Sequence, residues 1–225
     1  MILDRKKKYL HIALNSTLSD AYQIIRTLPV SDRIILEAGT PLIKQYGLEA
    51  ISQIASLWRR RLMGTNITPY VVADMKTMDR AETEVVLAKA AGASGVICLG
   101  RAPLETIDHF VAVCKREGLD SFVDMMNVTE PIQIMRNLKH KPNVILLHRG
   151  VDEELFNKNK PIPYVQINKV LSSYDVFIGI GGGDTIREVQ RAVFNNASVV
   201  MVWKNFYSAR DNTSALAEEF LKGIK

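Results

Sequence analysis

The chain has 225 residues, 47% hydrophobic and 24% charged, which excludes a disordered or collagen-like chain. Its 29 basic and 24 acidic residues give a net charge of +5. Its two cysteines, Cys98 and Cys114, cannot form a disulfide framework, and we interpret them as reduced packing residues. No apolar run reaches the ~18 residues of a membrane span, and no signal-peptide core follows the basic N-terminus. We expect one cytoplasmic domain over residues 1–225.

Eight short apolar runs rich in Val and Ile recur along the chain and are typical of buried strands. They lie at 9–14, 33–36, 70–73, 95–99, 121–125, 143–147, 175–180 and 198–202. Amphipathic segments between them predict helices at 19–27, 42–60, 80–91, 104–117, 129–138 and 184–194. This alternation indicates a parallel sheet covered by helices, and eight units fit an α/β fold of the single-domain (β/α)8 TIM barrel type. A doubly wound open sheet is the alternative.

Local signals set the expected boundaries. Ser19 and Thr129 are predicted helix N-caps, and Gly92 and Gly118 are predicted helix ends. The stretches 59–69 and 151–163 are predicted to be irregular, and the second is long enough to cover a site. The basic residues of the first stretch are interpreted as a solvated loop rather than a nucleic-acid surface, because no binding motif surrounds them; they are Arg59, Arg60 and Arg61.

Ionisable residues close most of the predicted strands, at the barrel end where active sites lie. Glu37 and Asp74 are hard oxygen ligands suited to Mg²⁺, although each could instead cap a helix or pair with a base. Lys76 lies two residues beyond Asp74, on the same face of an extended segment, and can donate to a developing oxyanion. His148 can act as a general acid or base. Strand five ends near Asp124.

A glycine-rich turn, followed by a helix, predicts an anion site built from backbone N–H groups after strand seven. Lys204, after strand eight, could add a positive charge, and Arg149 follows His148 on the same rim. The predicted phosphate-binding set is Gly181, Gly182, Gly183, Lys204 and Arg149. His11, His109 and His140 have no such neighbours in the pattern and are interpreted as structural.

Three motifs carry a resemblance to a known family. They are Ile-Ile-Leu-Glu-Ala-Gly-Thr-Pro-Leu-Ile-Lys at 34–44, Ala-Asp-Met-Lys-Thr-Met-Asp at 73–79 and Leu-His-Arg-Gly-Val-Asp-Glu at 147–153. Together they resemble the 3-hexulose-6-phosphate synthase branch of the orotidine 5′-monophosphate decarboxylase superfamily. The resemblance runs in order along nearly the whole chain from Leu10 onward.

This resemblance implies a homodimeric barrel that reversibly condenses formaldehyde with D-ribulose 5-phosphate in an Mg²⁺-dependent aldol reaction. Glu37 and Asp74 would bind the metal, which holds a 1,2-enediolate. Lys76 would hydrogen-bond the enediolate, His148 would move the proton, and Asp79 would reach the partner subunit's site. The glycine-rich turn and the loop after strand eight would hold the 5-phosphate.

The chain departs from the family pattern at the first, seventh and eighth strands. Asn15 stands where the family has a catalytic aspartate, which removes a charge that helps set the proton state of the lysine. The eighth strand ends in the bulky stretch Val-Trp-Lys-Asn-Phe at 202–206, where the family has a small residue and glycine, and Trp203 cannot replace a glycine at close backbone approach. Two alternatives therefore stay open: a lyase or decarboxylase acting on another phosphorylated or anionic substrate, and a non-catalytic relative.

Overall fold

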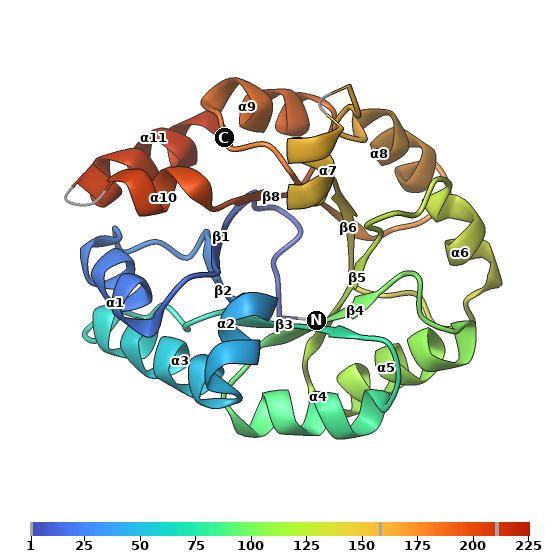
Figure 1. Cartoon of the computed structure of the whole chain (residues 1–225), viewed down its shortest axis with the longest axis horizontal. Coiled ribbons are helices and arrows are strands. Elements are labelled where there is room, and N and C mark those ends of the chain that lie inside the picture. Colours follow the sequence, from blue (N-terminus) through green and yellow to red (C-terminus); the bar gives the residue numbers. More distant parts are fainter. Residues whose placement is uncertain (1, 158, 210–211) are drawn as a thin grey trace.

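The eight apolar runs form eight parallel strands that close into a barrel in the computed structural model, which describes residues 2–157, 159–209 and 212–225 (Figure 1). Each strand pairs with the next in sequence, and β8 pairs with β1. The strands are β1 Tyr9–Leu14, β2 Ile34–Ala38, β3 Val71–Thr77, β4 Gly95–Leu99, β5 Asp120–Asp124, β6 Val144–His148, β7 Phe177–Gly181 and β8 Val199–Val202. The predicted TIM barrel is confirmed, and the open sheet is excluded.

The helices lie in a ring outside the strands (Figure 1). They are α1 Leu18–Thr27, α2 Thr40–Tyr46, α3 Glu49–Arg61, α4 Ala81–Ala90, α5 Leu104–Glu117, α6 Pro131–Asn137, α7 Val151–Phe156, α8 Tyr164–Leu171, α9 Ile186–Phe194, α10 Lys204–Ala209 and α11 Thr213–Gly223. The predicted helix 42–60 is two helices, because the chain turns at Gly47, which caps α2. The stretch 151–163 is not wholly irregular, because it begins with α7.

Two predicted caps are wrong by one or two residues. Thr17, not Ser19, is the N-cap of α1: its side chain accepts the N–H of Asp20 at 3.1 Å, and the Asp20 carboxylate accepts the N–H of Thr17 in return. Glu130, not Thr129, precedes α6. Of the predicted ends, Gly118 caps α5, whereas α4 ends at Ala90 with Ala91 as its C-cap, so Gly92 lies one residue beyond the cap. Thr17 is the N-cap because Thr17 and Asp20, an acid three residues later, form a capping box, in which each side chain accepts the backbone N–H of the other residue.

The inward side chains of the strands form their own core, separate from the core between strands and helices. At the floor of the barrel, Leu3 joins this inner core. Asp120 accepts the N–H groups of Ile2 and Leu3 and the hydroxyl of Tyr70, the last at 2.9 Å. The N-terminal segment thus covers the N-terminal ends of the strands, and the C-terminal ends form the mouth.

The basic run and the cysteines have structural explanations. Arg59, Arg60 and Arg61 form the last turn of α3 rather than a loop, and Arg61 donates to the carbonyl of Leu28 at the end of α1. Cationic side chains at a helix C-terminus compensate its dipole. Cys98 and Cys114 are buried and unpaired, and burial raises the pKa of Cys98 to about 12. Across the described ranges, no helix is long and apolar enough to cross a membrane.

Candidate functional site

Strand β3 reaches into the mouth of the barrel through an irregular end. Ala73 pairs with Val96 and Thr77 pairs with Cys98, so the register with β4 shifts between these two pairs. Lys76 lies inside this bulge with a φ of 50°, the left-handed region that non-glycine residues rarely adopt. Such backbone strain is concentrated at functional sites, where the surrounding structure sustains it. The sequence pattern predicted a plain extended segment here, and the bulge corrects it.

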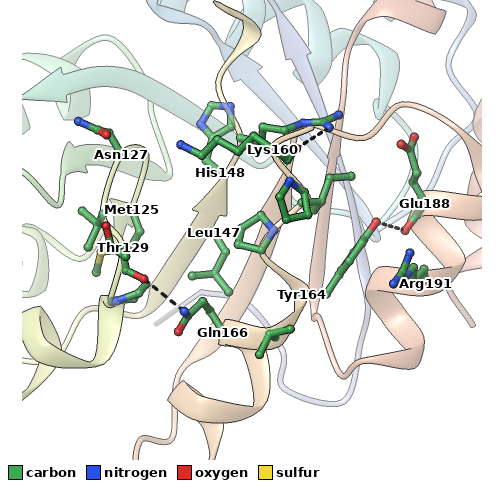
Figure 2. Close-up of a pocket in the computed structure, with 17 residues that line it drawn as sticks. Met125, Asn127, Thr129, Leu147, His148, Lys160, Tyr164, Gln166, Glu188 and Arg191 are labelled. Atoms are coloured by element: carbon green, nitrogen blue, oxygen red, sulfur yellow. Dashed lines mark hydrogen bonds between the residues drawn. The ribbon is translucent and has the colours of Figure 1, made fainter. Parts of the chain in front are cut away.

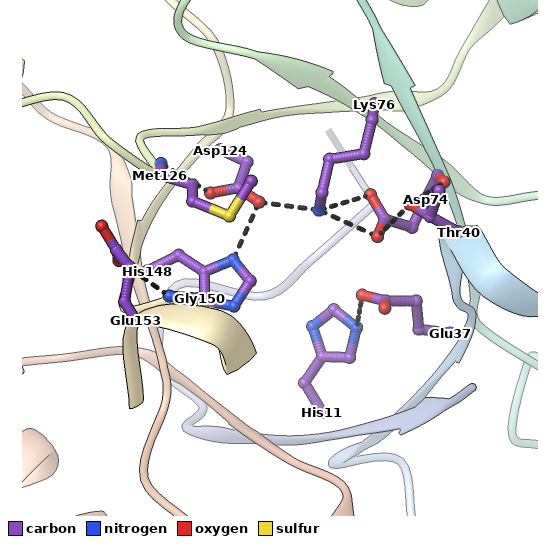
Figure 3. Close-up of polar contacts among 10 residues, drawn as sticks. All are labelled: His11, Glu37, Thr40, Asp74, Lys76, Asp124, Met126, His148, Gly150 and Glu153. Atoms are coloured by element: carbon purple, nitrogen blue, oxygen red, sulfur yellow. Dashed lines mark hydrogen bonds and ion pairs between the residues drawn. The ribbon is translucent and has the colours of Figure 1, made fainter. Parts of the chain in front are cut away.

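Lys76 forms the centre of a buried polar network (Figure 3). Its Nζ donates to both carboxylate oxygens of Asp74, at 3.0 and 2.9 Å, and to Oδ2 of Asp124 at 2.8 Å. Burial by itself lowers the pKa of Lys76, but the two carboxylates outweigh it and raise the pKa well above its usual value. The raised pKa favours the charged ammonium group, which carboxylates from two β-strands, β3 and β5, hold in place.

Asp124 links this lysine to His148. Its Oδ2 lies 2.9 Å from Nδ1 of His148, and its Oδ1 accepts the N–H of Met126 at 2.9 Å. Burial opposes the charge, but His148 and Lys76 hold the pKa of Asp124 well below its usual range. In return, burial lowers the pKa of His148 while Asp124 raises it, and the net shift is upward. The sequence pattern placed Asp124 at a strand end, but its pairing with both cations emerges only here.

Asp74 is anchored from the neighbouring strand loop. The hydroxyl of Thr40, the first residue of α2, donates to Oδ2 of Asp74 at 2.8 Å and lies 2.9 Å from its backbone carbonyl. Burial raises the pKa of Asp74, with the Lys76 charge opposing it. The predicted ligand is thus a fixed carboxylate that faces the lysine.

Glu37 meets an unexpected partner, His11 of β1. Both side chains are buried inside the barrel, and Oε2 of Glu37 lies 2.8 Å from Nε2 of His11. The contact lacks hydrogen-bond geometry, which leaves this oxygen and both ring nitrogens without a hydrogen bond. His11 therefore contacts a predicted site residue, and the prediction that it has no such neighbour is wrong.

The residues present fit a hard divalent cation. A buried carboxylate oxygen without a hydrogen bond is costly, and a bound cation would satisfy it. Within the described part of the chain, no three His, Cys, Asp or Glu side chains surround one metal position. An ion held by Glu37 and Asp74 would complete its shell with substrate oxygens and water, as Mg²⁺ commonly does.

The two cationic side chains predicted to hold a phosphate, Arg149 and Lys204, are engaged within the chain. Gly182 has a φ of 96°, and a Cβ there would lie 2.5 Å from the carbonyl oxygen of Arg149. The Arg149 guanidinium donates to the carbonyls of Gly182, at 2.6 Å, and Lys160, at 3.2 Å. Nζ of Lys204 lies 2.7 Å from Oε2 of Glu154 on α7. The glycine-rich turn is therefore packed directly against Arg149.

Asn15 and Asp79 lie apart from the hydrogen-bonded network. The Asn15 side chain fills the space above Gly39, where a Cβ would come within 1.8 Å of its Oδ1. Its backbone N–H donates to the Tyr207 hydroxyl at 2.6 Å. Asp79 is exposed and precedes α4, beside Arg80. Neither placement tests the role predicted for the residue.

A separate cavity of about 570 Å³ opens beside the network (Figure 2). Leu147 lines it, and alternation along β6 places this side chain on the outer face of the barrel, opposite to its neighbour His148. Hydrogen bonds from Tyr164 to the Glu188 carbonyl and from Gln166 to the Thr129 carbonyl brace its walls. The cavity therefore lies between barrel and helices, with His148 at its border.

Comparison with known proteins agrees with this architecture. Residues 8–218 match the family described as orotidine 5′-phosphate decarboxylase / HUMPS. The chain is 37% identical over 204 residues to a "Bifunctional enzyme Fae/Hps" of Methanocaldococcus jannaschii, covering 90% of this chain and 49% of the relative. It is 32% identical over 221 residues to that of Methanocella arvoryzae, covering 96% and 53%. The chain thus spans about half the length of the curated relatives it matches.

Solved structures agree as well. A crystal structure of 3-hexulose-6-phosphate synthase superposes with a TM-score of 0.81 at 26% identity, covering 96% of this chain and all of that one. The family match, the relatives and this structure confirm the resemblance predicted from the three motifs.

Proposed function

Because the chain belongs to the orotidine 5′-phosphate decarboxylase / HUMPS family, we propose that it is a carbon–carbon lyase that condenses formaldehyde with D-ribulose 5-phosphate, reversibly and with Mg²⁺. The observation that carries this proposal is the buried row His148, Asp124, Lys76 and Asp74, with Glu37 nearby (Figure 3). The row supplies a fixed cation, a proton carrier and hard oxygen ligands at one mouth of the barrel.

Glu37 and Asp74 would hold the metal, which, when bound, acts as a Lewis acid on the two adjacent oxygens of the sugar. The chain's own part is to fix these carboxylates. Thr40 holds Asp74 from α2, and His11 lies against Glu37 from β1. Preorganised ligands of this kind need little rearrangement when a substrate arrives.

Lys76 would stabilise the negative charge that develops on the sugar oxygens. Its raised pKa keeps it protonated, so it acts as a hydrogen-bond donor rather than a base. Its side chain keeps 20% of its surface exposed, which leaves room for contact with a substrate from the mouth. The carboxylates of Asp74 and Asp124 hold the ammonium group in one position while a substrate binds.

His148 would carry the proton. Asp124 holds Nδ1 of His148, so Nε2 would exchange the proton with the substrate, as in other catalytic histidine–carboxylate pairs. The neutral ring would take a proton from C1 of ribulose 5-phosphate to form the enediolate. C1 would then bond to the formaldehyde carbon, and the resulting alkoxide would recover a proton from the imidazolium.

The remaining parts of the proposal follow from the family resemblance. The 5-phosphate would meet the end of β7 and the start of α10, near Gly182, Gly183, Lys204 and Arg149. Asp79 is exposed on the surface before α4, an arrangement compatible with its reaching the site of a second copy in a homodimer. A cytoplasmic location is part of the same proposal.

A second candidate is a lyase or decarboxylase with the same metal and proton groups and a different anionic substrate. One observation favours it: Lys204 and Arg149 are already engaged by acceptors of the chain itself. A substrate that does not depend on these two cations would meet no such competition.

The proposal is tested by formaldehyde consumption with ribulose 5-phosphate, with Mg²⁺ and after chelation. Turnover should require the metal and should fall at least ~100-fold in Lys76→Met, which removes the charge and keeps the stem. Lys89→Met, at an exposed position of α4, is the matched control and should retain activity. A folded wild type that binds metal and shows no turnover, even as Asn15→Asp, would reject this reaction and favour the second candidate.

A further inference from the structure

Asp184 lies at the point where a phosphate is expected. It directly follows the glycine-rich turn, and its Oδ1 accepts the backbone N–H of Trp203, at the end of β8, at 2.7 Å. Its own carbonyl accepts the side-chain amide of Asn205 at 2.6 Å. The carboxylate thus occupies an amide at the β8 end of the predicted anion site.

A second carboxylate neutralises the cation of the same site. Oε2 of Glu154 lies 2.7 Å from Nζ of Lys204, and each of these side chains is only about one-third exposed, at 32% and 33%. The Lys204 ammonium also lies 5.5 Å from the centre of the Trp203 ring. This lysine is therefore held between α7 and β8 instead of pointing freely at a ligand.

The third group, Arg149, is committed to backbone carbonyls of Gly182 and Lys160. Beside the glycine-rich turn, the predicted site offers the Trp203 N–H, Lys204 and Arg149, and the first two already bind carboxylates. A phosphate monoester carries nearly two negative charges at neutral pH and would have to displace or approach both carboxylates. Like charges at a half-buried site repel strongly, because the effective dielectric constant there is far below that of water.

We propose that Asp184 is a specificity-determining residue whose carboxylate, held on the N–H group of Trp203, repels the phosphate of a substrate. It lowers the affinity for a phosphate dianion at this end of the barrel and favours substrates whose group there carries less charge. Glu154 acts in the same direction by holding Lys204. This inference deepens the proposed function, since it concerns the phosphate end of the same site.

The test measures binding of inorganic phosphate to the full chain by calorimetric titration, which needs no turnover and so is independent of the reaction. Asp184→Asn removes the charge and keeps an oxygen for the Trp203 N–H. It should bind phosphate at least ~10-fold more tightly than wild type. Asp152→Asn, an exposed carboxylate on α7, is the matched control and should leave the dissociation constant unchanged.

Glu154→Gln provides a second arm that leaves the β7 turn untouched, and it should also tighten phosphate binding. If Asp184→Asn binds phosphate no more tightly than wild type while its circular dichroism is native, the proposal is overturned. Equal tightening in Asp152→Asn would also overturn it, since a general charge effect would then suffice. If formaldehyde turnover is absent but phosphate binding responds as expected, the proposed function fails and this inference stands.

Discussion

The two halves of the barrel mouth treat charge in opposite ways. From β2 to β6, the carboxylates Asp74 and Asp124 surround Lys76 and orient it and His148 toward the mouth. At β7 and β8, the carboxylates Asp184 and Glu154 occupy the very groups that would otherwise bind an anion. We propose that the first half acts on the reacting atoms of a substrate and that the second half limits which substrates bind. This contrast separates chemistry from specificity within one rim.

The sharpest test of the first half is Asp124→Asn. The variant leaves Lys76 and His148 without their shared counter-charge, so we expect kcat to fall ~10²–10⁴-fold in the condensation assay. Breaking a buried ion pair should also cost about 3–5 kcal/mol of folding free energy, measured by urea denaturation. Asp184→Asn changes the same residue type in the second half and should spare kcat. Equal losses of kcat in Asp124→Asn and Asp184→Asn would show that the two halves do not differ in their effect on the reaction.

Gly182→Ala tests whether the turn under Arg149 is rigid. A methyl group there would lie 2.5 Å from a backbone oxygen and would require a φ of 96°. We expect a loss of about 2–3 kcal/mol in the free energy of unfolding. Gly64→Ala is the matched control, because it has a φ of 82° and open space around the new methyl, and it should cost only about 1 kcal/mol. Equal costs would show that the close approach of Arg149 is unimportant.

His11→Gln tests whether His11 positions Glu37, one of the two predicted metal ligands. Removing the imidazole takes away the group that lies against Glu37, and ligand affinity typically changes ~10-fold when an outer partner is lost. We expect weaker Mn²⁺ binding, followed by electron paramagnetic resonance with Mn²⁺ in place of Mg²⁺. His109→Gln, at a position far out on α5, should bind Mn²⁺ as wild type does. Unchanged affinity in His11→Gln would mean that Glu37 is oriented without His11.

The smallest expected effect is in the pH dependence of stability. Because the pKa of His148 is raised above 6.5, its pairing with Asp124 stabilises the fold fully below pH 6.5. This contribution disappears as the pH rises through the folded-state pKa, while Asp124 stays ionised. The stability lost in His148→Gln, measured as the free energy of unfolding, should therefore shrink as the pH rises from 6.5 through the folded-state pKa. A stability loss in His148→Gln that grows as the pH rises would refute the pairing.

Reading the chain was sufficient for the barrel and for much of the rim. Strand alternation with helices constrains the topology, since parallel strands joined by helices expose their polar ends at one mouth. Asp74, Lys76 and His148 were predicted from this rule. His11 was misinterpreted, because its spacing says nothing about the depth at which Glu37 would meet it inside the barrel.

The remaining features are contacts that sequence position alone does not choose. Asp124 lies 48 residues from Lys76 and 24 from His148, and the bulge in β3 decides that the lysine reaches it. The glycine-rich turn predicted an anion site, but Asp184, the residue that follows the turn, accepts the N–H of Trp203.

The sequence by itself determined the alternation of strands and helices, and with it which side chains stand on the rim, because hydrophobic periodicity is a local property. The tertiary structure decided which of those charged side chains pair with one another and which bind backbone groups. That choice depends on distances of about 3 Å between separate strands, and only the closed barrel sets such distances.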